Sequence, residues 1–145
     1  MWNGLTGGVF IWAVPFALSC CVIIPDENGQ MVRTLDEHHF RTLMVVSAGV
    51  ACFFASSKCR PASLREGVRL AVTFLVVNWL LDLLVLVPLM VTADGEELSR
   101  ATWAMKVPVW FREIGAGYLG GVWVPIIAGK GFEEGKREEN DGKNE

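Results

Sequence analysis

The sequence predicts an all-α protein, built as a four-helix transmembrane bundle. Of its 145 residues, 52% are hydrophobic and only 20% are charged. The charges are clustered, and between the clusters lie apolar segments close to the roughly 20 residues that a helix needs to cross a bilayer. Four such segments occur, at residues 5–24, 40–57, 67–93 and 107–129. We therefore expect one membrane domain over residues 1–129.

The first three segments each carry a local signal. The stretch MWNGLTGG before the first has no basic residue, and no clear A-x-A site follows, so we expect a retained helix and not a cleaved signal peptide. The second follows TLDE, whose spacing is that of a capping box in which Thr34 caps the helix and Glu37 reaches back. The third contains Arg69, Asn78 and Asp82 but remains long enough to span.

The fourth segment is rich in glycine. Gly117 and Gly121 form a GxxxG pair, and Gly120 lies between them. Small residues at this spacing let two transmembrane helices approach closely. In the second segment, Ala48 belongs to a line of small residues at helical spacing, so we expect these two helices to pack through small side chains.

The distribution of basic residues predicts the orientation in the cell membrane. The loop between the second and third segments carries Lys58, Arg60 and Arg65, against Glu66 alone. The positive-inside rule places this loop in the cytoplasm, and four crossings then place both termini there as well. The tail at residues 130–145 has mixed charge and few apolar residues, and is expected to be disordered.

Asp82 is the residue least expected in its surroundings. It lies eleven residues before Ala93, which is about 16 Å along a helix. A charge at that depth in a bilayer is unfavourable, so Asp82 should be protonated, paired or in contact with water. Asn78 is four residues earlier, on the same helix face. Arg112 or Arg41 is the expected counter-charge.

These residues suggest a polar cluster in the half of the bundle remote from the basic loop. The proposed binding or ion-pathway residues come from three predicted helices: His38, Arg41, Asn78, Asp82, Arg112, Glu113 and Tyr118. One interpretation is a site for a small ion or small molecule. The other is a buried network of ion pairs that only fixes the packing. The sequence leaves both open.

The cysteines and the absent motifs limit the metal, redox and enzymatic functions that the sequence favours. Cys20 and Cys21 are adjacent, which would suit soft-metal or redox chemistry, although membrane cysteines usually act as small apolar residues. CxxC and HExxH motifs are absent from the sequence, and no nucleophile–base pair stands out. We therefore expect no metal site and no cofactor, and we lean against an enzyme. The sequence also has no nucleic-acid signature.

Five segments occur in an order that resembles a known family. They are WAVPF at 12–16, FRTLM at 40–44, REG at 65–67, NWLLDLLVLVPLM at 78–90 and FREIGAGYL at 111–119. Together they resemble an uncharacterised family of small four-span integral membrane proteins of archaea and bacteria, over about residues 9–127. The resemblance implies four spans and implies no activity. The positions that match its pattern are Arg41, Glu66, Asn78, Asp82 and Tyr118.

Three functions fit the sequence. The first is a small transporter or channel subunit in the lipid bilayer, which should be a homo-oligomer because four helices enclose little pathway alone. The second is a structural or assembly protein that uses the glycine stripe as its contact face. The third is a thiol redox or soft-metal membrane protein that uses Cys20 and Cys21.

Overall fold

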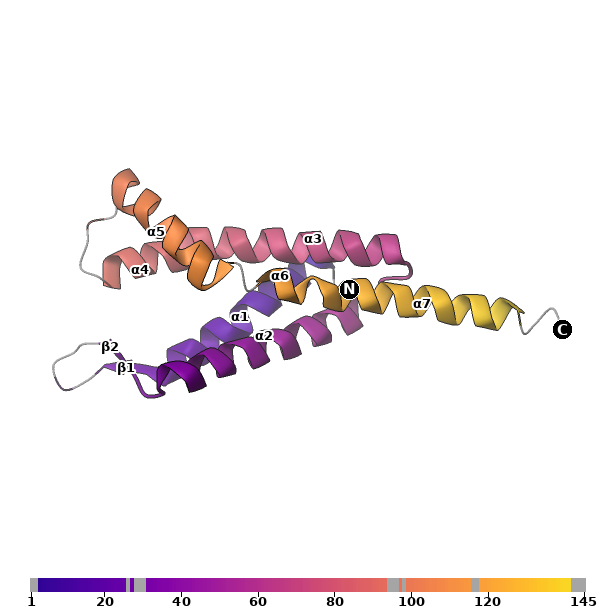
Figure 1. The fold of residues 1–145 in the computed structure, drawn as a ribbon, viewed down its shortest axis with the longest axis horizontal. Coiled ribbons are helices and arrows are strands. Elements are labelled where there is room, and N and C mark those ends of the chain that lie inside the picture. The colour runs from indigo at the N-terminus through magenta and orange to yellow at the C-terminus, as the bar shows by residue number, and fades with distance from the viewer. Residues whose placement is uncertain are drawn as a thin grey trace.

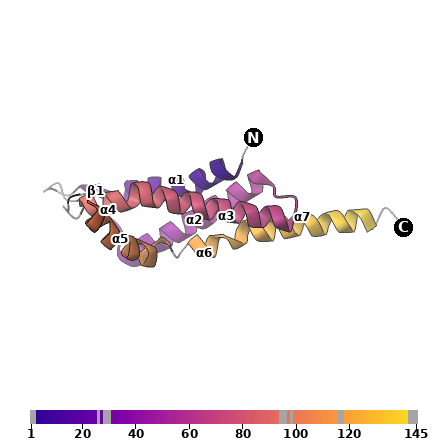
Figure 2. The same ribbon diagram turned by 90° about the horizontal axis from the view of Figure 1, so that it is seen from above.

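The computed structural model describes residues 3–25, 27, 31–93, 97, 99–115 and 118–141. The chain is mostly helical, which confirms the all-α class. Three helical stretches are long and apolar enough to cross a membrane, namely Gly4–Val22, Glu37–Cys59 and Leu64–Leu89. They lie side by side in an elongated molecule, and the C-terminal helix extends beyond one end (Figures 1 and 2).

The first helix, α1 (Gly4–Val22), is capped by Asn3, whose side chain accepts a hydrogen bond from the Thr6 amide. A short hairpin that the sequence did not reveal follows it. Its strands β1 (Ile23–Pro25) and β2 (Met31–Arg33) pair antiparallel, with Ile24 opposite Val32. Three-residue strands carry too little alternation to be recognised from a sequence.

The helix α2 (Glu37–Cys59) begins two residues later than the TLDE motif suggests. Its cap is Asp36, which accepts a hydrogen bond from the His39 amide at 3.0 Å. This backbone hydrogen bond, with a second one from the His39 side chain, lowers the pKa of Asp36 below its ordinary value. Thr34, the expected cap, instead bonds the Val22 carbonyl and closes the hairpin.

The third rod is continuous but changes its helical geometry partway along. It consists of α3 (Leu64–Leu81), the π-helical segment η1 (Asp82–Leu86) and α4 (Val87–Ala93). The Val87 amide bonds the Asp82 carbonyl, five residues back. Pro88 has no amide hydrogen to donate, which explains a displaced hydrogen-bond ladder immediately before it. Asp82 is therefore the first residue of the irregular segment.

The fourth crossing is not the single helix expected over residues 107–129. The helix α5 (Arg100–Glu113) ends at Ile114, and the chain continues as α6 (Tyr118–Gly121) and α7 (Trp123–Asp141). Glycine is among the poorest helix formers, and Gly115, Gly120 and Gly121 are concentrated at this interruption. The described structure thus shows three candidate spans and an interrupted helical segment α5–α6–α7, and the predicted four-helix transmembrane bundle is not confirmed.

The helix α7 also continues through most of the tail expected to be disordered. It is helical to Asp141, and ion pairs one turn apart, such as Arg137 with Glu133 at 3.0 Å, support the exposed part. Gly129 packs against the Ser63 carbonyl at the start of α3, and the end of α7 projects beyond the bundle (Figure 2).

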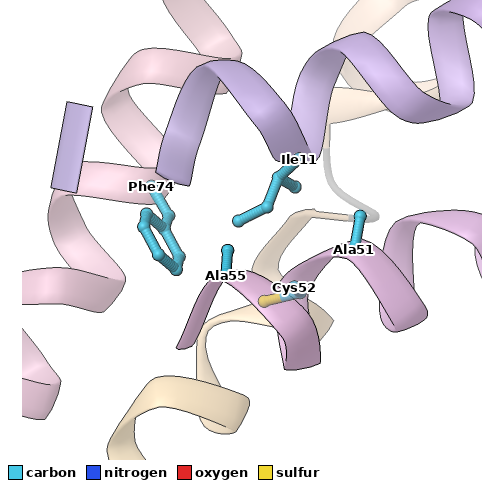
Figure 3. Packing of buried hydrophobic residues seen from close by; sticks show 5 residues of the cluster. All are labelled: Ile11, Ala51, Cys52, Ala55 and Phe74. Atoms are coloured by element: carbon cyan, nitrogen blue, oxygen red, sulfur yellow. The ribbon is translucent and has the colours of Figure 1, made fainter. Parts of the chain in front are cut away.

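The interior of the bundle is narrow and lined by small residues. Its core joins α1, α2 and α3, and Figure 3 shows Ile11 and Phe74 against Ala51, Cys52 and Ala55. Large apolar side chains instead point outward: Val45 and Phe53 on α2 are 73% and 68% exposed. Small residues inside and large apolar residues outside are typical of helices packed within lipid. This distribution agrees with a membrane protein.

Candidate functional site

Asp82 is buried between three helical elements, with 1% of the residue exposed. The indole Nε1 of Trp12 on α1 donates to its Oδ1 at 2.7 Å, and the Nε1 of Trp110 on α5 donates to its Oδ2 at 3.0 Å. The Tyr118 hydroxyl of α6 forms a third hydrogen bond. One carboxylate therefore ties α1, the irregular third rod and the interrupted segment α5–α6 together. We call Trp12, Asp82, Trp110 and Tyr118 the Asp82 cluster.

Asn78 extends this polar interior by one helical turn. It is 1% exposed, and its Nδ2 donates to the Gly8 carbonyl at 3.1 Å and to the Phe74 carbonyl at 2.8 Å. These bonds hold α1 against α3. Among the described residues its Oδ1 has no donor. Asn78 and Asp82 both face the interior, as their spacing predicts, and Asn78 presents an acceptor oxygen there.

The break between α5 and α6 is held against the third rod at Trp79, one turn before Asp82. The Nε1 of Trp79 donates to the Gly115 carbonyl at 3.0 Å. The Trp79 ring also packs edge-on to Phe111, with the ring centroids 5.9 Å apart. A carbonyl released by the end of α5 is thereby satisfied inside the bundle. Both departures from regular α-helix, η1 and the break after Glu113, thus lie next to Asp82.

The expected counter-charges are not among the described partners of Asp82. The Arg41 guanidinium is exposed and pairs with Glu37 at 2.7 Å, and Arg112 is exposed as well. Trp110 occupies the face of α5 toward Asp82, and Arg112 is about 200° around the helix from it. The prediction of an arginine partner is therefore corrected: the carboxylate is held by neutral donors.

Other predicted members also lie elsewhere. His38 is exposed and its ring meets that of His39 edge-on, so it is outside the cluster. The side chain of Glu113 lies outside the described part of the chain. Among the predicted residues of 107–129 whose side chains the structure describes, Tyr118 reaches Asp82 and Arg112 does not.

Trp12 and Trp110 were missed because tryptophan near a span end usually marks the membrane interface. The signal that could have found them is an indole N–H within an apolar segment that also has to satisfy a buried carboxylate.

The predicted packing glycines contribute less than expected. A side chain added at Gly120 would meet nothing within 4 Å, and Gly117 lies outside the described residues. Gly121 offers its carbonyl to the Cys52 thiol, and Ala48 is half-buried. The closest approaches occur instead at Gly7 and Gly8 on α1, and at Gly67 and Gly129 between α3 and α7.

The cysteines do not form a metal site in the described structure. Cys20 and Cys21 are exposed at the end of α1, whereas Cys52 is buried. No group of three or more His, Cys, Asp or Glu side chains within the described ranges is arranged to hold a metal ion.

Thiol labelling can test the predicted orientation. Cys20 and Cys21 lie at one end of the bundle, and Cys59 lies at the other, where its thiol meets the Asn3 carbonyl. With the basic loop in the cytoplasm, a membrane-impermeant maleimide should label a variant retaining only Cys20 and Cys21 in intact cells. A variant retaining only Cys59 should be labelled after permeabilisation. The reverse pattern would contradict the orientation, and a third variant that retains only the buried Cys52 serves as the unlabelled control.

The Asp82 cluster can hold a negative charge or a proton. The two indole N–H groups can only donate, so they favour the ionised carboxylate. A protonated carboxyl group needs an acceptor for its O–H, and the Tyr118 hydroxyl can donate or accept. The Asp82–Tyr118 pair is therefore where a proton can be held. Comparison with models of protein families, with curated proteins and with solved structures finds no match for this chain.

Proposed function

We propose that this protein is a small transporter or channel-like subunit in which Asp82 binds a proton or a small cation. The observation that carries the proposal is the pairing of an intramembrane carboxylate with a spare acceptor oxygen. Asn78 Oδ1 lies one turn from Asp82 on the same face, and no described group donates to it. Acceptor oxygens on one face of a helix in an apolar interior suit a cation or a protonated water molecule.

The backbone around Asp82 supports the same proposal. Short π-helical segments occur frequently at functional sites. Interrupted helices within a membrane are tolerated where they are buried in protein or line a cavity, as in many transporters. Here η1 begins at Asp82, and the break in the fourth crossing is fastened at Gly115. Because Asp82 is buried, this proposal requires the cluster to open during transport.

We propose an arrangement in the membrane that fits this function. The broken segment α5–α6–α7 serves as the fourth crossing, and both termini lie on the cytoplasmic side with the basic loop. A single chain with so narrow an interior encloses little pathway, so the active form is a homo-oligomer. The bilayer itself is the surrounding partner.

Proton flux into liposomes tests this function. Purified protein in vesicles that contain a pH-sensitive dye should dissipate an imposed pH gradient, in the presence of valinomycin and potassium. Asp82→Asn should reduce the protein-dependent rate at least tenfold, whereas Asp36→Asn, which removes an exposed carboxylate and keeps a helix cap, should not. Parallel traces with sodium and potassium gradients identify the ion. Folded Asp82→Asn protein with the wild-type rate for every ion would contradict the proposal.

A specific observation also favours an assembly role. Each oxygen of the Asp82 carboxylate already has an indole donor, and such a closed node can serve packing alone. In that case Asp82→Asn should leave the cellular complex intact, and Gly121→Leu should dissociate it, because the glycine stripe is the proposed contact face between chains and Gly121 is partly exposed. Size-exclusion chromatography of the two variants in mild detergent distinguishes assembly from transport.

A further inference from the structure

A groove opens on the side of the bundle where the third rod meets α5. Its volume is about 380 Å³, and it is lined by Leu83, Leu84, Pro88, Ser99, Arg100 and Trp103. The helices α4 and α5 form this part of the molecule, at the end remote from the C-terminus (Figure 1). The groove does not include Asp82, so it is distinct from the cluster described above.

The lining changes from apolar to cationic along the groove. Leu83 and Leu84 lie in η1, and Pro88 is one turn nearer the end of the rod. Across from them, α5 begins at Arg100 directly after its cap Ser99, and Trp103 is one turn further into that helix. Leu84 is 72% exposed, so the apolar part of the groove opens sideways to whatever surrounds the bundle.

We propose that this groove binds a phospholipid with an anionic headgroup. Its acyl chain lies over Leu84, Pro88 and Trp103, and its phosphate meets the Arg100 guanidinium. Charge complementarity selects the headgroup, because arginine binds phosphate with two parallel hydrogen bonds. The membrane supplies the ligand directly, since the groove faces outward from helices that span it. Tryptophan at this level suits the boundary between acyl chains and headgroups.

Bromine-labelled lipids provide the test, because bromine quenches tryptophan only at close contact. The full-length protein is reconstituted in phosphatidylcholine vesicles with a small, fixed share of brominated phosphatidylglycerol or brominated phosphatidylcholine. The fluorescence lost in Trp103→Phe identifies the Trp103 component. For that component we expect phosphatidylglycerol to bind about fivefold more tightly than phosphatidylcholine, the effect of one basic residue near an anionic lipid.

The arginine variants decide whether the preference belongs to this groove. Arg100→Gln should abolish it, and Arg100→Lys should keep most of it. Arg33→Gln is the matched control, because Arg33 is an exposed cation outside the groove, paired with Glu37. Free inorganic phosphate should not displace the lipid. Equal quenching by the two lipids in the wild type, or a preference that survives Arg100→Gln, would overturn the proposal. Neither result bears on ion flux through Asp82.

Discussion

Asp82→Leu is expected to lower the free energy of unfolding by about 2–5 kcal/mol, from three membrane hydrogen bonds of about 0.6–1.7 kcal/mol each. Leucine fills a similar volume but accepts no hydrogen bond. The Nε1 groups of Trp12 and Trp110 would then lose their acceptor inside the bundle, as would the Tyr118 hydroxyl. Buried donors without partners account for the loss, more than any change in packing.

Asp82→Asn should fall between the wild type and the leucine variant. The amide keeps one acceptor oxygen but turns an N–H donor toward one of the two indoles, so one of those hydrogen bonds is lost. Thermal unfolding in mild detergent, monitored by tryptophan fluorescence, gives the stability of all three proteins. The signal includes Trp12 and Trp110, which donate to Asp82. Asp36→Asn, exposed at the start of α2, is the control and should unfold as the wild type does. If the leucine variant were as stable as the wild type, the hydrogen bonds of Asp82 would not contribute to the stability of the fold. If it also left every measured flux unchanged, the site itself would be excluded.

Much of the architecture follows from hydropathy and charge. The first three helices occupy the segments predicted to span, because an uninterrupted apolar run has few alternatives to a helix in lipid. The spacing of Asn78 and Asp82 also places both side chains on one inward face, and both are buried. These predictions need only the period of the α-helix.

The partners of Asp82 could not be predicted in the same way. Complementary charge suggested Arg41 or Arg112 as the partner of Asp82. A carboxylate can accept hydrogen bonds of the same geometry from neutral groups. Which residues reach it depends on how α5 is rotated, and α5 is a separate helix that ends at Glu113. Sequence spacing cannot register residues across such a break. The hairpin between α1 and α2 was missed for a related reason, since its strands are fixed by pairing and not by their own pattern.

The positions of the close contacts between small residues could not be predicted from sequence spacing either. A GxxxG pair indicates that close approach is allowed, and not where it happens. Around Gly120 there is open space, whereas Gly67 and Gly129, which belong to no such pair, lie where α3 and α7 touch. The packing of α3 against α7 decides which glycines are in close contact. That packing depends on how the chain turns back between residues 93 and 123.

Gly67→Ala is therefore expected to destabilise the protein even though alanine is the better helix former. A Cβ atom at Gly67 would stand 2.5 Å from the Pro125 carbonyl oxygen and 3.2 Å from the Ile126 Cα. Both are backbone atoms, so no side-chain rotation can relieve the overlap. Overpacking of this kind costs about 1–3 kcal/mol, and the gain in helix propensity offsets up to about 1 kcal/mol.

Gly120→Ala is the matched control, because it makes the same chemical change in open space. It should leave stability unchanged or raise it by up to about 1 kcal/mol. Separation of α3 from α7 should also weaken the contact between the Leu64 amide and the Glu133 carboxylate, now 3.2 Å long. Hydrogen exchange at Leu64 should then quicken in Gly67→Ala and not in Gly120→Ala. Equal stability and equal exchange in the two variants would mean that α7 is not held against α3 through these glycines, and the fourth crossing would need a different contact to close the bundle.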